Sequence, residues 1–276
     1  MVKSRKPTNI TTTAVRCFHK LSCPFPSFLR FIDNQIFKVL FFFRFHLTCH
    51  LSYQKMGCCG KLFLTLFVVL TCMIPFFLYI DQPQHWVYDP VRLQEIAKEG
   101  TAKAKAIHGE GATGRQIVDE VIKVMVEAYP ETTRYTGNWL WNNAGGAMGS
   151  MTVLHCSFSE YIIMFGSATG TEGNSGRFLA DDYFTIVYGE QWAAVPGGDK
   201  EVYKPGDQHW MHRGVAKQYR MPDECWALEY ARGNIPSMML FGFMDLLTST
   251  VDPITFAQTI YESAGNMLMN TLRGKI

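Results

Sequence analysis

Carboxylates inside apolar, strand-like stretches are the residues of this chain best suited to chemistry. Asp181 and Asp182 lie in FLADDYFTIVYG. Glu229 lies in CWALEYARG, and Glu160 lies in SFSEYIIMFG. A carboxylate that is buried as an unpaired ion is costly, so such a group finds a cation, becomes protonated or has a raised pKa. Two carboxyl groups in one apolar cavity would share a proton, which suits donating a proton at one atom and removing one at another.

The structural alternative is that each acid faces solvent or pairs with a base. Arg177, Arg232 and Lys217 are available for such pairs. Composition and spacing do not choose between a catalytic and a structural acid, so both interpretations stay open at this stage.

Two histidines and one glycine-rich stretch suggest other chemistry. His209 and His212 form an H-x-x-H, but small metal-binding β-barrels use another spacing and no nearby acid completes a ligand triad. We therefore expect no metal, and a metal-dependent enzyme remains the alternative that predicts stoichiometric metal. The stretch GTEGNSGR lacks the Lys-Ser/Thr ending of a phosphate loop, so we expect a hairpin turn there.

A membrane anchor is predicted before these residues. Leu62–Ile80 has 19 residues and no charged side chain, which is long enough for a transmembrane helix. Lys55 and Lys61 precede it and Asp81 follows, which favours a cytosolic N-terminus and a luminal remainder. A cleaved signal peptide is the alternative, although the apolar run is long and no A-x-A-like site follows.

The N-terminal segment differs in charge from the rest. Residues 1–55 carry nine Lys/Arg and one acid, whereas the remainder has 17 Lys/Arg and 23 Asp/Glu. The acidic remainder does not resemble a nucleic-acid binder. Residues 1–55 have no coherent periodicity, so they are an upstream extension with the true start at Met56, a targeting segment, or a disordered or interfacial tail.

Helices and then strands should follow the anchor. Asp89-Pro90 and the capping box of Thr113 and Gln116 each start a helix, and the second helix should stop near Tyr129. From about Asn138, short runs rich in β-branched and aromatic residues predict an antiparallel barrel or sandwich. These runs are MTVLHCSF, EYIIMFGSA, YFTIVYGEQWAAV, EVYKPG, HRGVAKQY and CWALEYARG.

The C-terminal part should again be helical. Ile235-Pro236 and Asp252-Pro253 open two helices. The first is apolar nearly all round, so it is either buried or in contact with lipid. Of the eight cysteines, only Cys156 and Cys225 lie in the globular part, and we expect them to be free thiols in apolar surroundings.

Several ordered blocks of the sequence resemble one protein family. WNNAGGAMGSMTVLHCSFSEYIIMFGSATGTEGNSGRFLADDYFTI, PGDQHWMHRGVAKQY and CWALEYARGNIPSMMLFGFMDLLTSTVD resemble the fungal sterol delta-8 to delta-7 isomerases (C-8 sterol isomerases) and their relative, the sigma-1 receptor. The resemblance runs from about Leu62 to the C-terminus. It implies an α+β fold with an N-terminal transmembrane helix, a cupin-like antiparallel β-barrel and two C-terminal membrane-associated helices.

The domain organisation expected from this resemblance has five parts. They are an N-terminal extension (1–61), the transmembrane helix (62–80), a helical connecting region (81–135), the barrel that holds the ligand (136–234) and the membrane-adjacent helices (235–276).

The resemblance also implies site residues. Glu229 matches the buried glutamate that pairs with the ligand amine in the receptor, and Asp181 or Asp182 should be the second catalytic acid. The receptor's second aspartate falls at Phe184 in an ungapped comparison. Substrate-binding positions are expected at Tyr161, which would orient Glu229, and at Phe165, His209, Met238 and Tyr183.

The implied activity is movement of a ring double bond by protonation and deprotonation, with no cofactor. The implied partners are a sterol, membrane lipid and inhibitory hydrophobic amines, with no nucleic acid. The implied assembly is a trimer and the implied location is the endoplasmic reticulum membrane, single-pass, with a luminal globular part. The rival hypothesis is a non-enzymatic receptor or regulator of the sigma-1 type, which would use the same pocket.

Overall fold

The structure is a computed structural model that describes residues 57–276. The predictions for residues 1–55 and the proposed start at Met56 lie outside the described residues. The chain divides into two compact units between Thr71 and Cys72, and the second unit contains both sheets. The helices are α2 (Cys58–Ile80), α3 (Pro90–His108), α4 (Gly114–Ala128), α5 (Ile235–Thr248) and α6 (Pro253–Leu272), with a short 3₁₀ helix at Pro83–His85.

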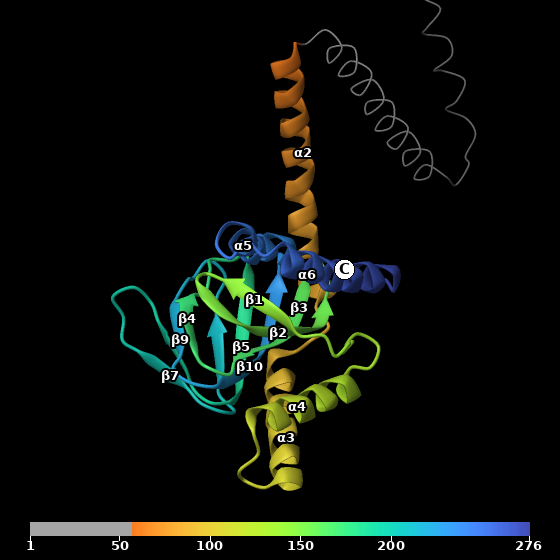
Figure 1. The fold of residues 1–276 in the computed structure, drawn as a ribbon. Helices are drawn as coiled ribbons and strands as arrows, with labels where there is room; N and C mark the ends of the chain where they lie inside the picture. Colours follow the sequence, from red (N-terminus) through yellow and green to blue (C-terminus); the bar gives the residue numbers. More distant parts are fainter. Residues whose placement is uncertain (1–56) are drawn as a thin grey trace, which may run out of the picture. The chain divides into compact units, whose positions relative to one another are not determined.

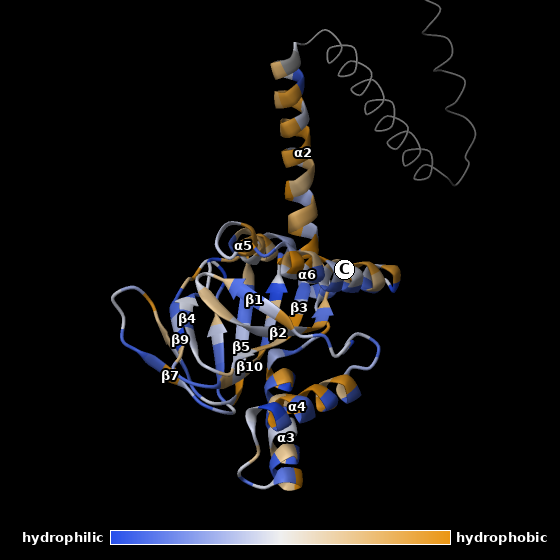
Figure 2. Ribbon diagram, in the orientation of Figure 1, coloured by the Kyte–Doolittle hydropathy of each residue, from blue (hydrophilic) through white to orange (hydrophobic). Residues whose placement is uncertain are grey.

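Helix α2 forms where the uncharged run predicts a helix. Among the described residues it is the one helix long and apolar enough to cross a membrane, over Cys59–Ile80. Its large apolar side chains are exposed, which is unlike the core helix of a soluble protein, and Figure 2 shows hydrophobic residues along its length.

Within residues 57–276, ten antiparallel strands form two sheets. The strands are β1 (Leu140–Ala144), β2 (Ala147–Cys156), β3 (Glu160–Ser167), β4 (Thr171–Asn174), β5 (Ala180–Tyr188), β6 (Gln191–Ala194), β7 (Glu201–Tyr203), β8 (Gln208–Met211), β9 (Gln218–Met221) and β10 (Cys225–Gly233). The larger sheet has the order β1-β2-β3-β10-β5-β8, and the smaller has the order β4-β9-β6-β7. The fold is therefore α+β with antiparallel sheets, as predicted.

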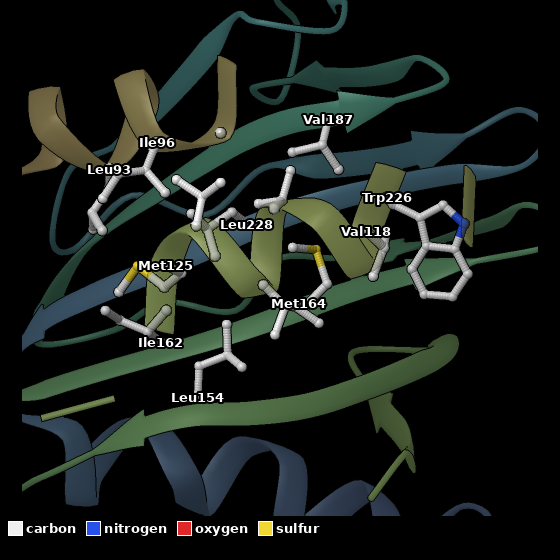
Figure 3. Packing of buried hydrophobic residues seen from close by; sticks show 14 of the residues in the cluster. Leu93, Ile96, Val118, Met125, Leu154, Ile162, Met164, Val187, Trp226 and Leu228 are labelled. Carbon is white, nitrogen blue, oxygen red and sulfur yellow. The ribbon is translucent and has the colours of Figure 1, made fainter. Parts of the chain in front are cut away.

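The large sheet is buried on both faces. Its outer face packs against α3 and α4, whose starts have the predicted caps at Asp89 and Thr113. Figure 3 shows this core, in which Leu93 and Met125 of the two helices approach Ile162 of β3. The inner face holds a second apolar cluster with residues of the small sheet. Because alternate residues of a strand point to opposite faces, each central strand contributes to both clusters.

Helices α5 and α6 contact β1 and β2, and Figure 1 shows them on a different side of the strands from α3 and α4. Helix α5 is not fully buried, because Leu240, Met244 and Leu247 are exposed. Helix α6 buries its polar side chains and exposes apolar ones, which is the opposite of a helix on the surface of a soluble protein. All of its buried residues are polar: Thr255, Thr259, Glu262, Ser263, Asn266 and Asn270.

Two local predictions were wrong. The stretch GTEGNSGR is not only a turn, because Thr171–Asn174 forms β4 and pairs with β9. Gly173 is needed there because a Cβ would lie 2.5 Å from the backbone nitrogen of Ala147, so close approach explains the glycine. The run HRGVAKQY is strand only from Gln218 onward, because Gly214 has a φ of +77° and interrupts the extended chain.

Candidate active site

A cavity lies inside the second unit between the two sheets, beneath α5 and α6. The large sheet supplies the acids and three aromatic side chains, and the small sheet supplies Asn174 and Tyr219. Helices α5 and α6 close the remaining wall. The apolar lining comprises Ala144, Met151, Ile163, Phe165, Phe178, Phe184, Met238, Met239, Phe241, Gly242, Phe243 and Leu246. Among the described residues, no Lys or Arg lines this cavity. Its interior thus lacks a cation that could neutralise an ionised acid.

Asp182 and Glu229 both line the cavity, on neighbouring strands. Glu229 of β10 is directly opposite Phe184 of β5, and Asp182 lies two residues before Phe184. Residues two apart on a strand share a face, and diagonal neighbours on adjacent strands lie about 7–8 Å apart between Cα atoms. Asp182 therefore lies on the same face of β5 as Phe184. Phe184 is the position at which the sequence comparison placed the receptor's second aspartate.

Both acids are buried, and within residues 57–276 no cation lines the cavity to balance their charge. Asp182 is 1% exposed, and neither of its carboxyl oxygens has a hydrogen-bond partner among the described residues. Burial raises the pKa of Asp182 well above its usual range, and the charge of Glu229 raises it further. Burial also raises the pKa of Glu229. Two coupled acids of this kind retain a shared proton at a pH where exposed carboxyl groups are ionised.

Asp181 lies on the opposite face of β5 and does not line the cavity. Its carboxylate accepts hydrogen bonds from the backbone nitrogen and the guanidinium of Arg213, both at 3.1 Å. The same guanidinium contacts Asp81 at 2.6 Å. Asp181 is thus an ion-pairing residue, which was the structural alternative considered for each acid. Of the two adjacent aspartates, only Asp182 shares the cavity with Glu229.

Three expected substrate-binding residues do line the cavity: Tyr161, Phe165 and Met238. Tyr161 and Ile163 are two residues apart on β3 and share one face of the strand. Ile163 lies directly opposite Glu229 of β10. Its hydroxyl donates to the sulfur of Met151 at 3.8 Å instead of bonding to Glu229. Burial raises the pKa of Tyr161, so the phenol stays neutral and can act only as a hydrogen-bonding group.

His209 and Tyr183 lie elsewhere. His209 stacks on Tyr203 and is 3.1 Å from the ammonium of Lys217, which in turn is 2.5 Å from Glu201. Burial, aided by the Lys217 charge, lowers the pKa of His209 to about 4, so its ring is neutral. Tyr183 faces the outer core, where it stacks between Trp210 and Tyr230.

Polar groups that sequence reasoning missed also line the cavity. They are Asn142, Asn174, Ser175, Tyr219, Thr259 and Ser263. The signal that could have found two of them is the polar stripe of α6, in which Thr255, Thr259, Ser263, Asn266 and Asn270 recur at helical spacing. The others come from short strands and turns that carry no such periodicity.

The arrangement is suited to moving protons. No group of three or more His, Cys, Asp or Glu residues that could hold a metal ion occurs within residues 57–276. Cys156 and Cys225 are buried free thiols, as predicted, and burial raises the pKa of both, so neither is a nucleophile. One protonated and one ionised carboxyl group can donate a proton to an apolar ligand and remove another.

Comparison with known proteins identifies one protein family. The family model described as "ERG2 and Sigma1 receptor like protein" matches residues 63–275. The C-8 sterol isomerase of Pyricularia oryzae is 44% identical over 220 residues, which cover 77% of this chain and 96% of that protein. The C-8 sterol isomerase ERG2 of Gibberella zeae is 43% identical and covers 81% of this chain and 94% of its own length.

The receptor branch matches a shorter part. Sigma non-opioid intracellular receptor 1 of Gallus gallus is 40% identical over 133 residues, which cover 48% of this chain and 60% of that protein. Among solved structures, an RmlC-like cupin from Shewanella frigidimarina has a TM-score of 0.32 and 17% identity and covers 37% of this chain and 91% of its own.

Proposed function

The chain belongs to the ERG2 and sigma-1-receptor-like protein family, and from that premise we propose that it is a sterol isomerase that moves a ring double bond from carbon 8 to carbon 7. The observation that carries the proposal is the pair Asp182 and Glu229, which share a cavity that has an apolar wall and no lining cation. Relatives named C-8 sterol isomerase, at 43–44% identity over most of the chain, support the same activity.

The proposed mechanism uses only the two carboxyl groups. The protonated acid gives its proton to carbon 9, and the electrons of the double bond form the new C–H bond, which leaves a tertiary cation at carbon 8. The ionised acid then removes a proton from carbon 7, and the electrons of that C–H bond form the new double bond. No hydride moves, so the step needs no redox cofactor. The remaining negative charge stabilises the cation strongly because most of the cavity wall is apolar.

This mechanism also accounts for the proposed binding of hydrophobic amines. A protonated amine carries a positive charge on an apolar body, as the carbocation does, and a site that stabilises the cation binds such a mimic tightly.

Complementation of a yeast that lacks its C-8 isomerase tests the activity. We expect the wild-type chain to restore delta-7 sterols, measured by mass spectrometry, and Glu229→Gln to restore none. Glu190→Gln is the matched control, since this glutamate lies outside the cavity. If the wild-type chain is expressed and binds amines without producing delta-7 sterols, the receptor hypothesis replaces the enzyme.

The proposed location is the endoplasmic reticulum membrane, crossed once by α2, with the globular part in the lumen. The uncharged run Leu62–Ile80 within α2, with Lys55 and Lys61 before it, supports this orientation. A glycosylation acceptor sequence added after Ile276 should be glycosylated in cells, and an unmodified acceptor would contradict the luminal placement.

Helices α5 and α6 are proposed to lie against the same membrane. Their exposed apolar residues are Leu240, Met244, Leu247, Ile254, Ile260, Tyr261, Leu268, Met269 and Leu272. Such a patch is unusual on a surface that faces water. A photo-crosslinking residue at position 247 should capture lipid, whereas one at Ile107, an equally apolar exposed position on α3, should not. A trimer is proposed from the resemblance, and analytical ultracentrifugation in detergent tests it.

A further inference from the structure

The polar face of α6 contains two hydroxyl groups that the structure leaves unused. Four of the six buried polar residues have partners: Thr255 with Asp252, Glu262 with Asn138, and Asn266 and Asn270 with backbone carbonyls. Thr259 and Ser263 are 6% and 2% exposed, and among the described residues neither hydroxyl oxygen has a hydrogen-bond partner of normal geometry. The Ser263 hydroxyl lies near the hydroxyl of Tyr161, whose pKa is raised by burial and lowered in part by this contact. Both residues line the cavity of Asp182 and Glu229.

Thr259 lacks a hydrogen bond that several other helical threonines of the chain make. Helical threonines commonly donate to the carbonyl four residues earlier, and Thr71, Thr101, Thr248 and Thr271 do so here at 2.7–2.8 Å. Thr259 lies in the same kind of helix and does not make this bond. A buried hydroxyl without a partner is unfavourable, so one that is kept facing a cavity is available to a ligand.

The position of the two hydroxyls relative to the acids is informative. Residues four apart on a helix lie one above the other on one face, so Thr259 and Ser263 form a pair. Helix α6 packs on β1 and β2, whereas Glu229 is on β10, two strands beyond β2, and Asp182 is on the next strand. Strands are about 4.8 Å apart, so the hydroxyl pair and the acids lie on separate walls of the cavity.

A sterol carries one polar group, the hydroxyl of ring A, and that group is separated from the carbon 8 double bond by the fused A and B rings. We propose that Thr259 and Ser263 bind this hydroxyl and thereby place the ring double bond at Asp182 and Glu229. The inference rests on the proposed function for its substrate class. A hydroxyl both donates and accepts a hydrogen bond, and two neighbouring hydroxyls supply one acceptor and one donor.

The consequence is selectivity for hydroxylated substrates. A site with buried hydrogen-bonding groups discriminates against a ligand that lacks the matching group, because its own groups are then left unpaired. An apolar steroid of the same shape without the hydroxyl should bind weakly, although it fills the same space.

The test compares a delta-8 sterol with its 3-deoxy analogue on the full chain in detergent. We expect the wild-type chain to bind the hydroxylated sterol at least about tenfold more tightly, with KM following binding, because one net hydrogen bond corresponds to roughly that factor. In the Thr259→Val, Ser263→Ala double variant this preference should disappear, and binding of a hydrophobic amine without a hydroxyl should be unchanged. Thr271→Val is the matched control, because its hydroxyl bonds to its own helix.

Each outcome decides the inference separately from the activity. Equal wild-type affinity for the two steroids, or a preference retained by the double variant, overturns the hydroxyl assignment. Loss of amine binding together with sterol binding in the double variant also overturns it, because the residues would then be structural. A wild-type chain that prefers the hydroxylated sterol but does not isomerise it contradicts the proposed activity and supports the hydroxyl pair.

Discussion

Asp181 and Asp182 are adjacent in the sequence, and the strand directs their side chains to opposite faces. Asp181 meets the guanidinium of Arg213 and is neutralised there. Asp182 enters the cavity, where the nearest charge that affects it is another acid, Glu229. The same residue type therefore has a structural role at one position and is available for proton transfer at the next.

Exchange of each aspartate for asparagine separates the two roles. Asp182→Asn should lower kcat by about 10²–10⁴-fold, because it removes a general acid or base. Asp181→Asn should keep most of the activity and lose on the order of 1 kcal/mol or less of stability, because it removes one partner of a partly exposed ion pair. Sterol conversion by the purified protein measures the activity of both variants. An equal loss of activity in the two variants would contradict this assignment.

The buried acids should also make stability depend on pH. In the folded chain the pKa of Asp182 is raised, whereas in the unfolded chain it is about 3.9. Above that pH the folded chain holds more protons than the unfolded chain, so the free energy of unfolding falls as pH rises toward the raised pKa. Unfolding in detergent, followed across this pH range, should show a smaller fall in the free energy of unfolding for Asp182→Asn than for the wild-type chain. Identical pH slopes for the two proteins would refute the prediction.

At the scale of elements, the buried carboxylate of Glu160 on β3 connects the segment after α6 to the segment before α3. Glu160 at the start of β3 is fully buried and contacts the ammonium of Lys275 at 2.7 Å. It also accepts hydrogen bonds from the backbone nitrogens of Val87 and Tyr88 and from the hydroxyl of Tyr230. These contacts give the acid a structural role, since its carboxylate oxygens accept from donors on three separate segments of the chain.

Removal of the cation should be costly. Lys275→Met leaves the Glu160 carboxylate buried without its counter-ion, which should lower the free energy of unfolding by about 3–5 kcal/mol. Lys103→Met is the control, because its pair with Glu127 is exposed and contributes less than about 1 kcal/mol. Thermal unfolding of the two variants measures the difference, and equal midpoints would show that the buried pair has no special role.

At the scale of the whole molecule, the family match begins at residue 63, at the start of the apolar part of α2. Most of the apolar helix α2 and all residues that line the cavity lie within the matched range. Residues 1–55, whose nine Lys/Arg and one acid give a net charge of +8, lie outside it.

A chain that starts at Met56 should therefore retain the activity. We expect it to restore delta-7 sterols in the isomerase-deficient yeast to the level of the full chain, and to remain in the membrane fraction. A version that starts at Asp81, without α2, is the contrasting variant and should leave the membrane fraction in part. Loss of sterol conversion on removal of residues 1–55 alone would show that this segment takes part in folding or targeting.

Local chemistry was sufficient to predict most elements from the sequence. Caps at Asp89, Thr113 and Asp252 are formed by residues close in sequence, so they mark helix starts without knowledge of the tertiary fold. The apolar run of α2 and the enrichment in apolar and aromatic residues around Glu229 are local in the same sense. The strand β4 was missed because its glycine is selected by close approach of Ala147, a contact between residues far apart in the chain.

The sequence by itself determined that acids would lie in apolar strands after a membrane-anchor helix, because both features depend only on residue type and spacing. The tertiary structure decided that Asp182 and not Asp181 shares a cavity with Glu229, because strand register sets which face meets which. It also decided that His209 joins Lys217 and Glu201, and that Thr259 and Ser263 line the same cavity as the two acids. Such pairings arise from packing between elements, which no local pattern encodes.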